Sequence, residues 1–157
     1  MKISIKLLVI GIFLISGFSG CKKGSTTPDP IIPDTTKPTI TIVKPTAGQT
    51  FSTGSAIVFQ ASFSDNVKLK SYEIAISKVI TGGLILKIVP TSIDFVYNRS
   101  STSFTAGVKL QEINISDILI PANTANTITT PGKYNVKVTC IDGSDNSTST
   151  TVEINIS

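Results

Sequence analysis

The chain has 157 residues, of which 40% are hydrophobic, 15% charged and 6% aromatic, and its formal net charge is +4. It contains no histidine, two cysteines and ten carboxylate side chains, so histidine-based catalytic triads and histidine-ligated zinc sites are excluded. This composition fits one compact domain with an appendage, and it disfavours most enzyme classes.

The N-terminus has the layout of a secretory signal peptide. Two lysines precede an apolar run over 7–15, and the small residues Ser16-Gly17 end that run before Phe18-Ser19-Gly20-Cys21. The run is too short for a membrane-spanning helix, which needs about 20 residues. Phe18-Ser19-Gly20-Cys21 resembles a bacterial lipobox, in which the cysteine receives a diacylglycerol. The sequence therefore predicts a signal peptide over 1–20 and lipidation of Cys21, with ordinary secretion as the alternative.

A lipid anchor predicts a location on a membrane face of the cell envelope, and the outer membrane is the expected membrane. Acidic residues directly after the lipidated cysteine serve as a surface-export signal in some bacterial lipoproteins. No acidic residue directly follows Cys21, which slightly favours the periplasmic face. Loss of the leader lowers the net charge from +4 to +2, too weak for nucleic-acid binding. The expected partners are the membrane and an envelope protein or polysaccharide.

Residues 21–37 are rich in Pro, Thr and Asp, and their only large apolar side chains are Ile31 and Ile32. Such a segment cannot build a core, so we expect a lipidated cysteine followed by an extended, semi-rigid tether. The folded domain is expected over 38–157. If Cys21 carries a lipid, Cys140 has no disulfide partner and is expected to be a small buried hydrophobe.

From residue 38 onward, apolar residues alternate with polar ones, which is the pattern of half-buried β-strands. The apolar residues lie at even positions up to Leu110 and at odd positions, Ile113 and Ile115, after it. This shift predicts a bulge near Gln111-Glu112. About eight short strands without an amphipathic helix predict an immunoglobulin-like antiparallel β-sandwich with Greek-key connections, with a small β-barrel as the alternative. The expected strands lie around 40–42, 57–63, 72–76, 84–88, 93–97, 104–110, 134–140 and 152–156.

The segment Gly132-Lys133-Tyr134 resembles the entry to the penultimate strand of immunoglobulin-like domains. Tyr134 is therefore a candidate for a tyrosine corner, in which the hydroxyl bonds to nearby backbone. A plain core tyrosine is the alternative.

Several short motifs occur along the domain: Pro38-Thr39-Ile40, Pro45 with Gly48, Phe63-Ser64-Asp65-Asn66, Ser71-Tyr72, Ile118-Leu119-Ile120-Pro121, Gly132-Lys133-Tyr134, and Asp142 near Asn146. Together they resemble a domain-of-unknown-function family of Bacteroidetes lipoproteins, the 4625 type, over about residues 37–157. The resemblance implies an immunoglobulin-like fold and an envelope location. It implies no activity.

Acidic loop residues offer oxygen ligands to calcium, which takes six to eight of them. Asp65, Asp142 and Asp145 follow two different strands, and they would share one end of a sandwich. The same residue types are common in turns, so a structural role is the alternative. No cofactor other than this calcium is expected.

Two further positions are candidates for other contacts. Sugar sites commonly use exposed aromatic rings, and Tyr97, beside Asn98 and Arg99 at a strand end, is the candidate ligand contact, with a core tyrosine as the alternative. Asp34-Thr35-Thr36 is similar to the O-glycosylation signal of exported Bacteroidetes proteins, which makes Thr35 a candidate modification site. The polar segment over 122–130 is the candidate for a variable loop that contacts a partner. A solvated crossover between the two sheets is the alternative.

The sequence thus predicts a non-catalytic cell-envelope lipoprotein that presents an immunoglobulin-like binding or structural module on a membrane face. A carbohydrate-binding or calcium-dependent adhesion module is the alternative. An enzyme would require a carboxylate pair such as Asp65 with Asp142, with one pKa raised.

Overall fold

The computed structural model describes residues 32–80 and 91–157. The leader, Cys21 and the strand expected at 84–88 lie outside these ranges. The described residues form strands and connections, and none of their segments is a helix long and apolar enough to cross a membrane. The strands are β1 (Thr39–Lys44), β2 (Thr50–Phe51), β3 (Ala56–Ser64), β4 (Leu69–Lys78), β5 (Thr91–Ile93), β6 (Tyr97–Ser103), β7 (Leu110–Leu119), β8 (Thr127–Thr129), β9 (Gly132–Asp142) and β10 (Ser147–Ile156).

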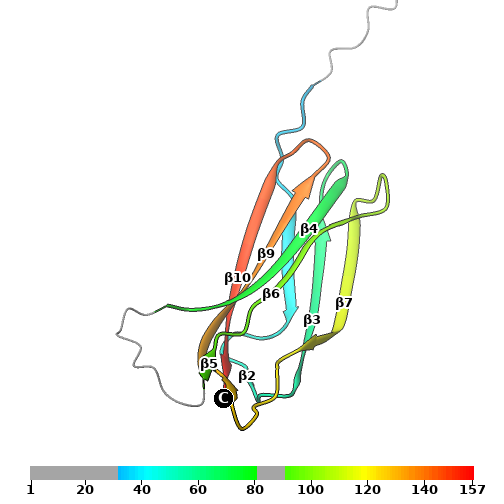
Figure 1. The fold of residues 1–157 in the computed structure, drawn as a ribbon. Helices are drawn as coiled ribbons and strands as arrows, with labels where there is room; N and C mark the ends of the chain where they lie inside the picture. The colour runs from blue at the N-terminus through cyan, green and yellow to red at the C-terminus, as the bar shows by residue number, and fades with distance from the viewer. Residues whose placement is uncertain (1–31, 81–90) are drawn as a thin grey trace, which may run out of the picture. The chain divides into compact units, whose positions relative to one another are not determined.

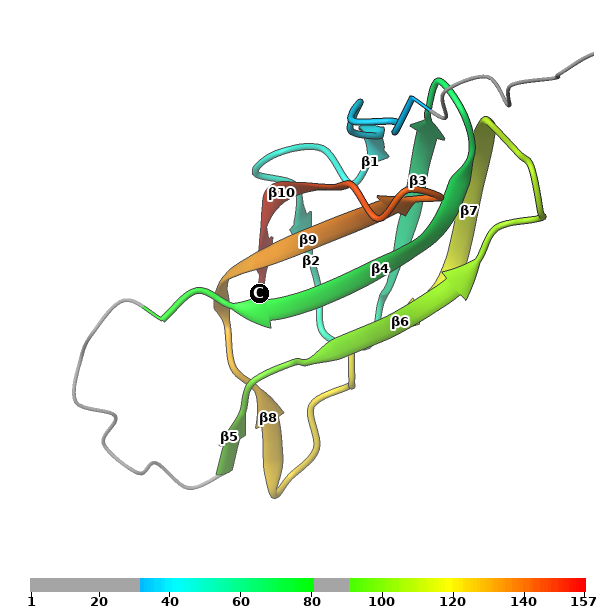
Figure 2. The ribbon, with the colours of Figure 1, turned by 90° about the horizontal axis from the view of Figure 1, so that it is seen from above.

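Two sheets face each other across one core (Figures 1 and 2). The three-stranded sheet has the order β1-β3-β7, and the five-stranded sheet has the order β2-β10-β9-β4-β6. All pairs in them are antiparallel except β2 with β10. The chain crosses between the two sheets from β1 to β2, from β2 to β3, from β3 to β4 and from β6 to β7. The expected immunoglobulin-like β-sandwich is confirmed, and the sheets do not close into a barrel.

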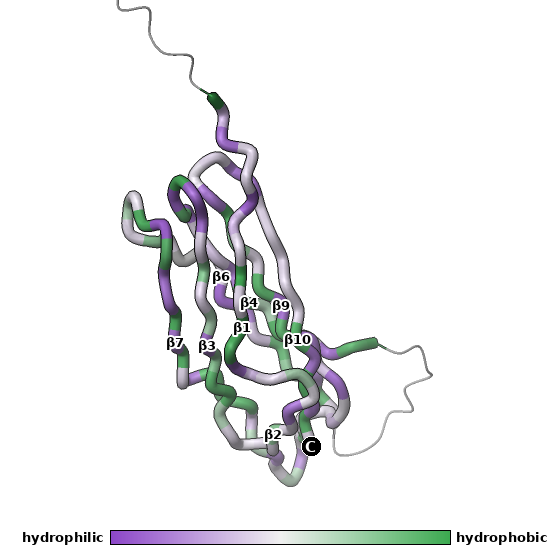
Figure 3. The backbone as a smooth tube through the Cα atoms, turned by 180° about the vertical axis from the view of Figure 1, so that it is seen from behind, coloured by the Kyte–Doolittle hydropathy of each residue, from purple (hydrophilic) through white to green (hydrophobic). Residues whose placement is uncertain are grey.

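The period-two pattern explains which face of each strand is buried. On β3, Ile57, Phe59, Ala61 and Phe63 are buried while the residues between them are more exposed. Figure 3 shows apolar and polar residues following one another along these strands. Burial of such apolar side chains stabilises the fold by about 25 cal/mol per Å² removed from water. The same rule holds on β9, where Tyr134, Val136, Val138 and Cys140 point into the core.

Two strand predictions need correction. The strand expected at 93–97 is divided, because β5 pairs in parallel with β8 in a separate two-stranded sheet, whereas β6 pairs with β4. Of the strand expected at 104–110, residues 104–109 form a connection between β6 and β7, and Leu110 begins β7. The connection turns at Gly107, whose φ of 79° is accessible to glycine, while Phe104 and Val108 pack against the core and keep the apolar phase.

The bulge expected near Gln111-Glu112 lies elsewhere. Both residues pair in regular register with β3, and the irregularity falls where Ile57 faces Ile118 and Phe59 faces Ile115. The extra residue sits in β7 and preserves the inward direction of both flanking isoleucines.

Residues just before β1 contact the sandwich. Backbone carbonyls of Asp34 and Thr36 accept hydrogen bonds from the side-chain amide of Asn146, at 3.0 and 3.3 Å. The last residues of the expected tether are therefore held against the domain, because a distant turn supplies donors for their backbone carbonyls.

Candidate functional site

Three carboxylates from distant parts of the chain meet at the end of the sandwich where β1 begins and β9 ends. Asp34 precedes β1, Asp65 follows β3, and Asp142 is the last residue of β9. Each offers one carboxylate oxygen, and these three atoms lie within 4.8 Å of one another. The Greek-key order places these residues together, because the β3–β4 connection, the β9–β10 connection and the start of β1 lie at the same end of the sandwich (Figure 1).

Asp142 organises the turn between β9 and β10 and is fully buried. Its Oδ1 accepts 2.8 Å hydrogen bonds from the backbone N–H of Ser144 and of Asn146, and its Oδ2 accepts one from the Asn146 side-chain amide. Burial acts to raise the pKa of Asp142, but these hydrogen bonds, with the nearby Lys70, hold the pKa below its usual value. The carboxyl is therefore a carboxylate at neutral pH.

Asp65 closes the turn between β3 and β4. Its Oδ2 accepts the backbone N–H groups of Val67 at 2.9 Å and of Lys68 at 2.7 Å, the local pattern typical of a turn aspartate. Its other oxygen, Oδ1, is shielded from solvent and accepts no hydrogen bond from the described residues. Half of this carboxylate is thus used by the turn and half is without a donor.

Asp34 repeats this arrangement. Its Oδ1 accepts the backbone N–H of Thr36 at 3.0 Å and the side-chain amide of Asn66 at 3.2 Å. Its Oδ2 is shielded from solvent and has no donor among the described residues. A buried polar atom without a partner normally costs about 1–3 kcal/mol, and more when it is charged.

Of the three aspartates expected at a calcium site, the structure brings together Asp65 and Asp142. Asp145 is exposed, has a φ of 67° in the β9–β10 turn, and pairs with Lys70 instead. Asp34 is the ligand candidate that sequence reasoning missed, since it was assigned to the tether. Its neighbours in space, Asp65 and Asp142, are far away in the sequence, so only the topology could place it.

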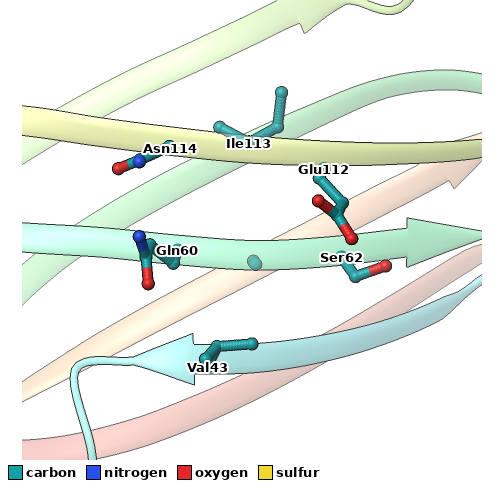
Figure 4. Close-up of a pocket in the computed structure, with 7 residues that line it drawn as sticks. Val43, Gln60, Ser62, Glu112, Ile113 and Asn114 are labelled. Carbon is teal, nitrogen blue, oxygen red and sulfur yellow. The ribbon is translucent and has the colours of Figure 1, made fainter.

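A shallow groove of about 440 Å³ lies on the outer face of the three-stranded sheet. Figure 4 shows this face with the five-stranded sheet behind it. Polar side chains from neighbouring strands β3 and β7 dominate its lining, and one valine from β1 borders it. The labelled lining residues are Val43, Gln60, Ser62, Glu112, Ile113 and Asn114. None of them is aromatic, so the groove offers hydrogen-bonding groups and no stacking platform.

The other candidate residues are spread over the domain. Tyr97 is half-buried at the start of β6 and packs partly against the core, and Thr35 is exposed beside Asp34. The segment over 122–130 is tied down at its end, because Thr129 is buried and its hydroxyl donates to the Pro121 carbonyl at 2.9 Å.

Tyr134 is fully buried, and its hydroxyl is bonded on both sides. The hydroxyl donates to the Thr130 carbonyl at 2.6 Å, four residues upstream, and it accepts the backbone N–H of Phe95 at 3.3 Å. The first of these contacts is the one that a tyrosine corner makes.

Comparisons with known proteins bear on the whole chain. The profile of the family described as domain of unknown function DUF4625 matches residues 20–157. The chain belongs to this family. No curated protein gives a significant match.

Among solved structures, the DUF4625 chain is similar to the fibronectin(III)-like modules of Clostridium thermocellum CbhA, with 16% identity and a TM-score of 0.42, over 76% of this chain and 46% of that one. It is also similar to a Listeria innocua β-glucosidase in complex with glucose, with 9% identity and a TM-score of 0.39, over 75% of this chain and 16% of that one. The chain thus spans less than half the length of either structure.

Proposed function

We propose that this DUF4625 protein is a non-catalytic lipoprotein of the bacterial cell envelope, anchored through Cys21, which presents its β-sandwich to an envelope partner. The export pattern over 1–20 and the lipobox-like residues before Cys21 support the anchor. Two or more acyl chains on one cysteine would hold the protein stably on a membrane, since each buried CH₂ contributes about 0.8 kcal/mol. We place it on the outer membrane, with the periplasmic face slightly favoured.

The observation that carries the non-catalytic assignment is that the buried reactive groups of the described domain are held in structural roles. Asp65 and Asp142 lie close together, but the Asp142 carboxylate already accepts three hydrogen bonds that hold its pKa below the usual value, which makes it a poor general acid at neutral pH. Burial raises the pKa of the Cys140 thiol to about 11, which removes it as a nucleophile at neutral pH. The Tyr134 hydroxyl is committed to backbone.

The anchor is tested by fractionation of cells that express Cys21→Ala. We expect the wild-type protein in the detergent-extracted membrane fraction and the Cys21→Ala protein in the soluble fraction. Cys140→Ala is the matched control, because it removes the other cysteine and leaves the anchor in place. Unchanged membrane association of Cys21→Ala would overturn the proposal.

A second candidate function, carbohydrate binding, is favoured by the groove on the three-stranded sheet. Gln60 and Asn114 face each other across β3 and β7, and Ser62 and Glu112 form the next cross-strand pair. Residues that alternate along a strand are about 6.6 Å apart on the same face, so these four side chains form a flat array of hydrogen-bonding groups. Hydroxyl groups along a sugar chain are suited to amide and carboxylate partners of this kind.

Native affinity electrophoresis in gels containing a soluble glucan, xylan or mannan tests this second candidate. We expect at least one polysaccharide to retard the wild-type protein, and the double variant Gln60→Ala/Asn114→Ala to migrate freely. Asn135→Ala is the control, since it removes an amide from the outer face of β9 in the opposite sheet. Equal migration of the wild-type protein in all gels, or equal retardation of the double variant, would remove carbohydrate binding from this groove.

A further inference from the structure

We propose that Asp34, Asp65 and Asp142 form a calcium site that fastens the start of the domain to the end of the sandwich. The site differs from the one expected from sequence, because Asp34 replaces Asp145. It is independent of the lipid anchor at Cys21, so either proposal can fail without the other.

The spacing of the carboxylates fits a calcium ion. Calcium binds oxygen at about 2.3–2.6 Å, so two oxygens on the same ion lie no more than about 5 Å apart. The three carboxylate oxygens meet this limit, since they lie within 4.8 Å of one another. Magnesium binds oxygen at about 2.0–2.1 Å and demands a near-ideal octahedron, whereas calcium accepts a more flexible geometry.

The buried oxygens supply an observation independent of the clustering. Asp34 Oδ2 and Asp65 Oδ1 are both shielded from solvent, and both lack a donor. Each belongs to a carboxylate whose other oxygen already accepts two N–H groups. A carboxylate that is half satisfied and half buried without a partner is stabilised by a cation at the unsatisfied oxygen.

The local charge points in the same direction. Within the described ranges, the ion pairs join Lys70 to Asp145, Lys78 to Asp94 and Lys133 to Glu153. None of them includes a cluster carboxylate, and Lys70 is the cation that lies near Asp142. Three carboxylates that share one site repel each other unless a cation lies between them. The oxygen-only ligand set selects a hard cation such as calcium over zinc, which prefers nitrogen and sulfur.

A cation at this position would link three separate segments. Asp34 belongs to the segment that leads from the anchor, Asp65 to the β3–β4 turn and Asp142 to the β9–β10 turn. The segment is otherwise held by hydrogen bonds from Asn66 and Asn146. Calcium would therefore shorten the free part of the tether and fix the direction in which the domain leaves it.

Thermal unfolding of the purified full chain with CaCl₂ tests the site. Calcium sites of extracellular modules bind at about 10⁻⁴–10⁻³ M, and at ten times the dissociation constant the melting temperature of the wild-type protein should rise by about 5 °C. MgCl₂ at the same concentration should produce a smaller rise.

The variants Asp65→Asn and Asp34→Asn separate metal binding from turn structure. In each variant, the amide oxygen can still accept the two N–H groups, while the NH₂ group replaces the unpartnered oxygen. Both variants should lose the calcium-induced rise. In chelator they should melt at or above the wild-type temperature, because a repelling charge is gone. A merely structural aspartate would instead lose stability in chelator.

Asp145→Asn is the matched control, since it removes a carboxylate from the same β9–β10 turn without touching the cluster. It should keep the calcium-induced rise of the wild-type protein. Hydrogen exchange of the segment over 33–37 should slow with calcium in the wild-type and control proteins alone. Two results would overturn the proposal. One is a wild-type melting temperature that does not rise at a calcium concentration of about 10⁻² M, ten times the upper dissociation constant given above. The other is a rise in Asp65→Asn and Asp34→Asn equal to that of the wild-type protein.

Discussion

Tyr134 is a single side chain whose polar and apolar ends have separate tasks. Its ring packs in the core and lies 6.3 Å from the ring of Phe95, while its hydroxyl holds the backbone of Thr130. Tyr134→Phe keeps the ring and leaves the Thr130 carbonyl without this donor. We expect it to lower the free energy of unfolding by about 1–2 kcal/mol in urea titrations. A loss below about 0.5 kcal/mol would contradict a hydroxyl that stabilises the corner.

The same hydroxyl predicts a pH dependence. Burial is the largest cause that raises the pKa of Tyr134, the hydrogen bond from Phe95 opposes it, and Asp94 adds to the rise. The folded pKa lies above the unfolded value of about 10, so this contribution is intact below pH 10 and is lost as the pH rises through the folded value. Stability should therefore decline more steeply above pH 10 in the wild-type protein than in Tyr134→Phe. Parallel pH profiles would argue against the raised pKa.

Cys140 illustrates how burial decides the chemistry of a residue. The side chain is fully buried on β9, and burial, with Asp65 and Asp142 nearby, raises its pKa to about 11. In a Cys21→Ala background, Cys140 is the only thiol, and we expect a maleimide to label it only after urea is added. Rapid labelling of the native protein would show that this end of the core opens easily.

Among the elements, the β9–β10 turn connects the most distant parts of the chain. The Asn146 side-chain amide donates to Asp142 Oδ2 and to the carbonyls of Asp34 and Thr36. Asn146→Ala removes these contacts, and we expect a loss of about 2 kcal/mol in unfolding free energy together with faster hydrogen exchange over 33–37. Asn98→Ala, on an exposed position of β6, is the control and should change neither quantity. Unaltered exchange in Asn146→Ala would mean that other contacts hold this segment.

Sequence periodicity predicted the elements that are buried on one face. β3, β4, β9 and β10 follow the alternation of apolar residues closely, since each packs one face on the core. It failed over 104–109, because Phe104 and Val108 pack against the core from a connection and imitate a strand. Apolar phase reports which side chains are buried and does not report whether their backbone is paired.

The candidate site was half predictable for a related reason. Asp65 and Asp142 lie at strand ends, where sequence already places turns, and the sandwich brings those turns together. Asp34 comes from a segment with no apolar pattern, and its contacts reach Asn66 and Asn146 across long stretches of chain. Local patterns carry no information about such contacts, whereas the strand order does.

At the scale of the whole molecule, we propose a lipid anchor at Cys21, a tether and a β-sandwich that binds an envelope partner. The hydrogen bonds from Asn146 to Asp34 and Thr36 hold the last residues of the expected tether against the sandwich. A calcium ion on Asp34 would add to this attachment.

The mass of the protein extracted from membranes tests the proposed lipid anchor. We expect a chain that lacks residues 1–20 and carries acyl and diacylglyceryl groups on Cys21, with Cys140 as a free thiol in the same digest. A membrane-extracted chain that retains its leader, or that begins at another residue with an unmodified Cys21, would contradict it.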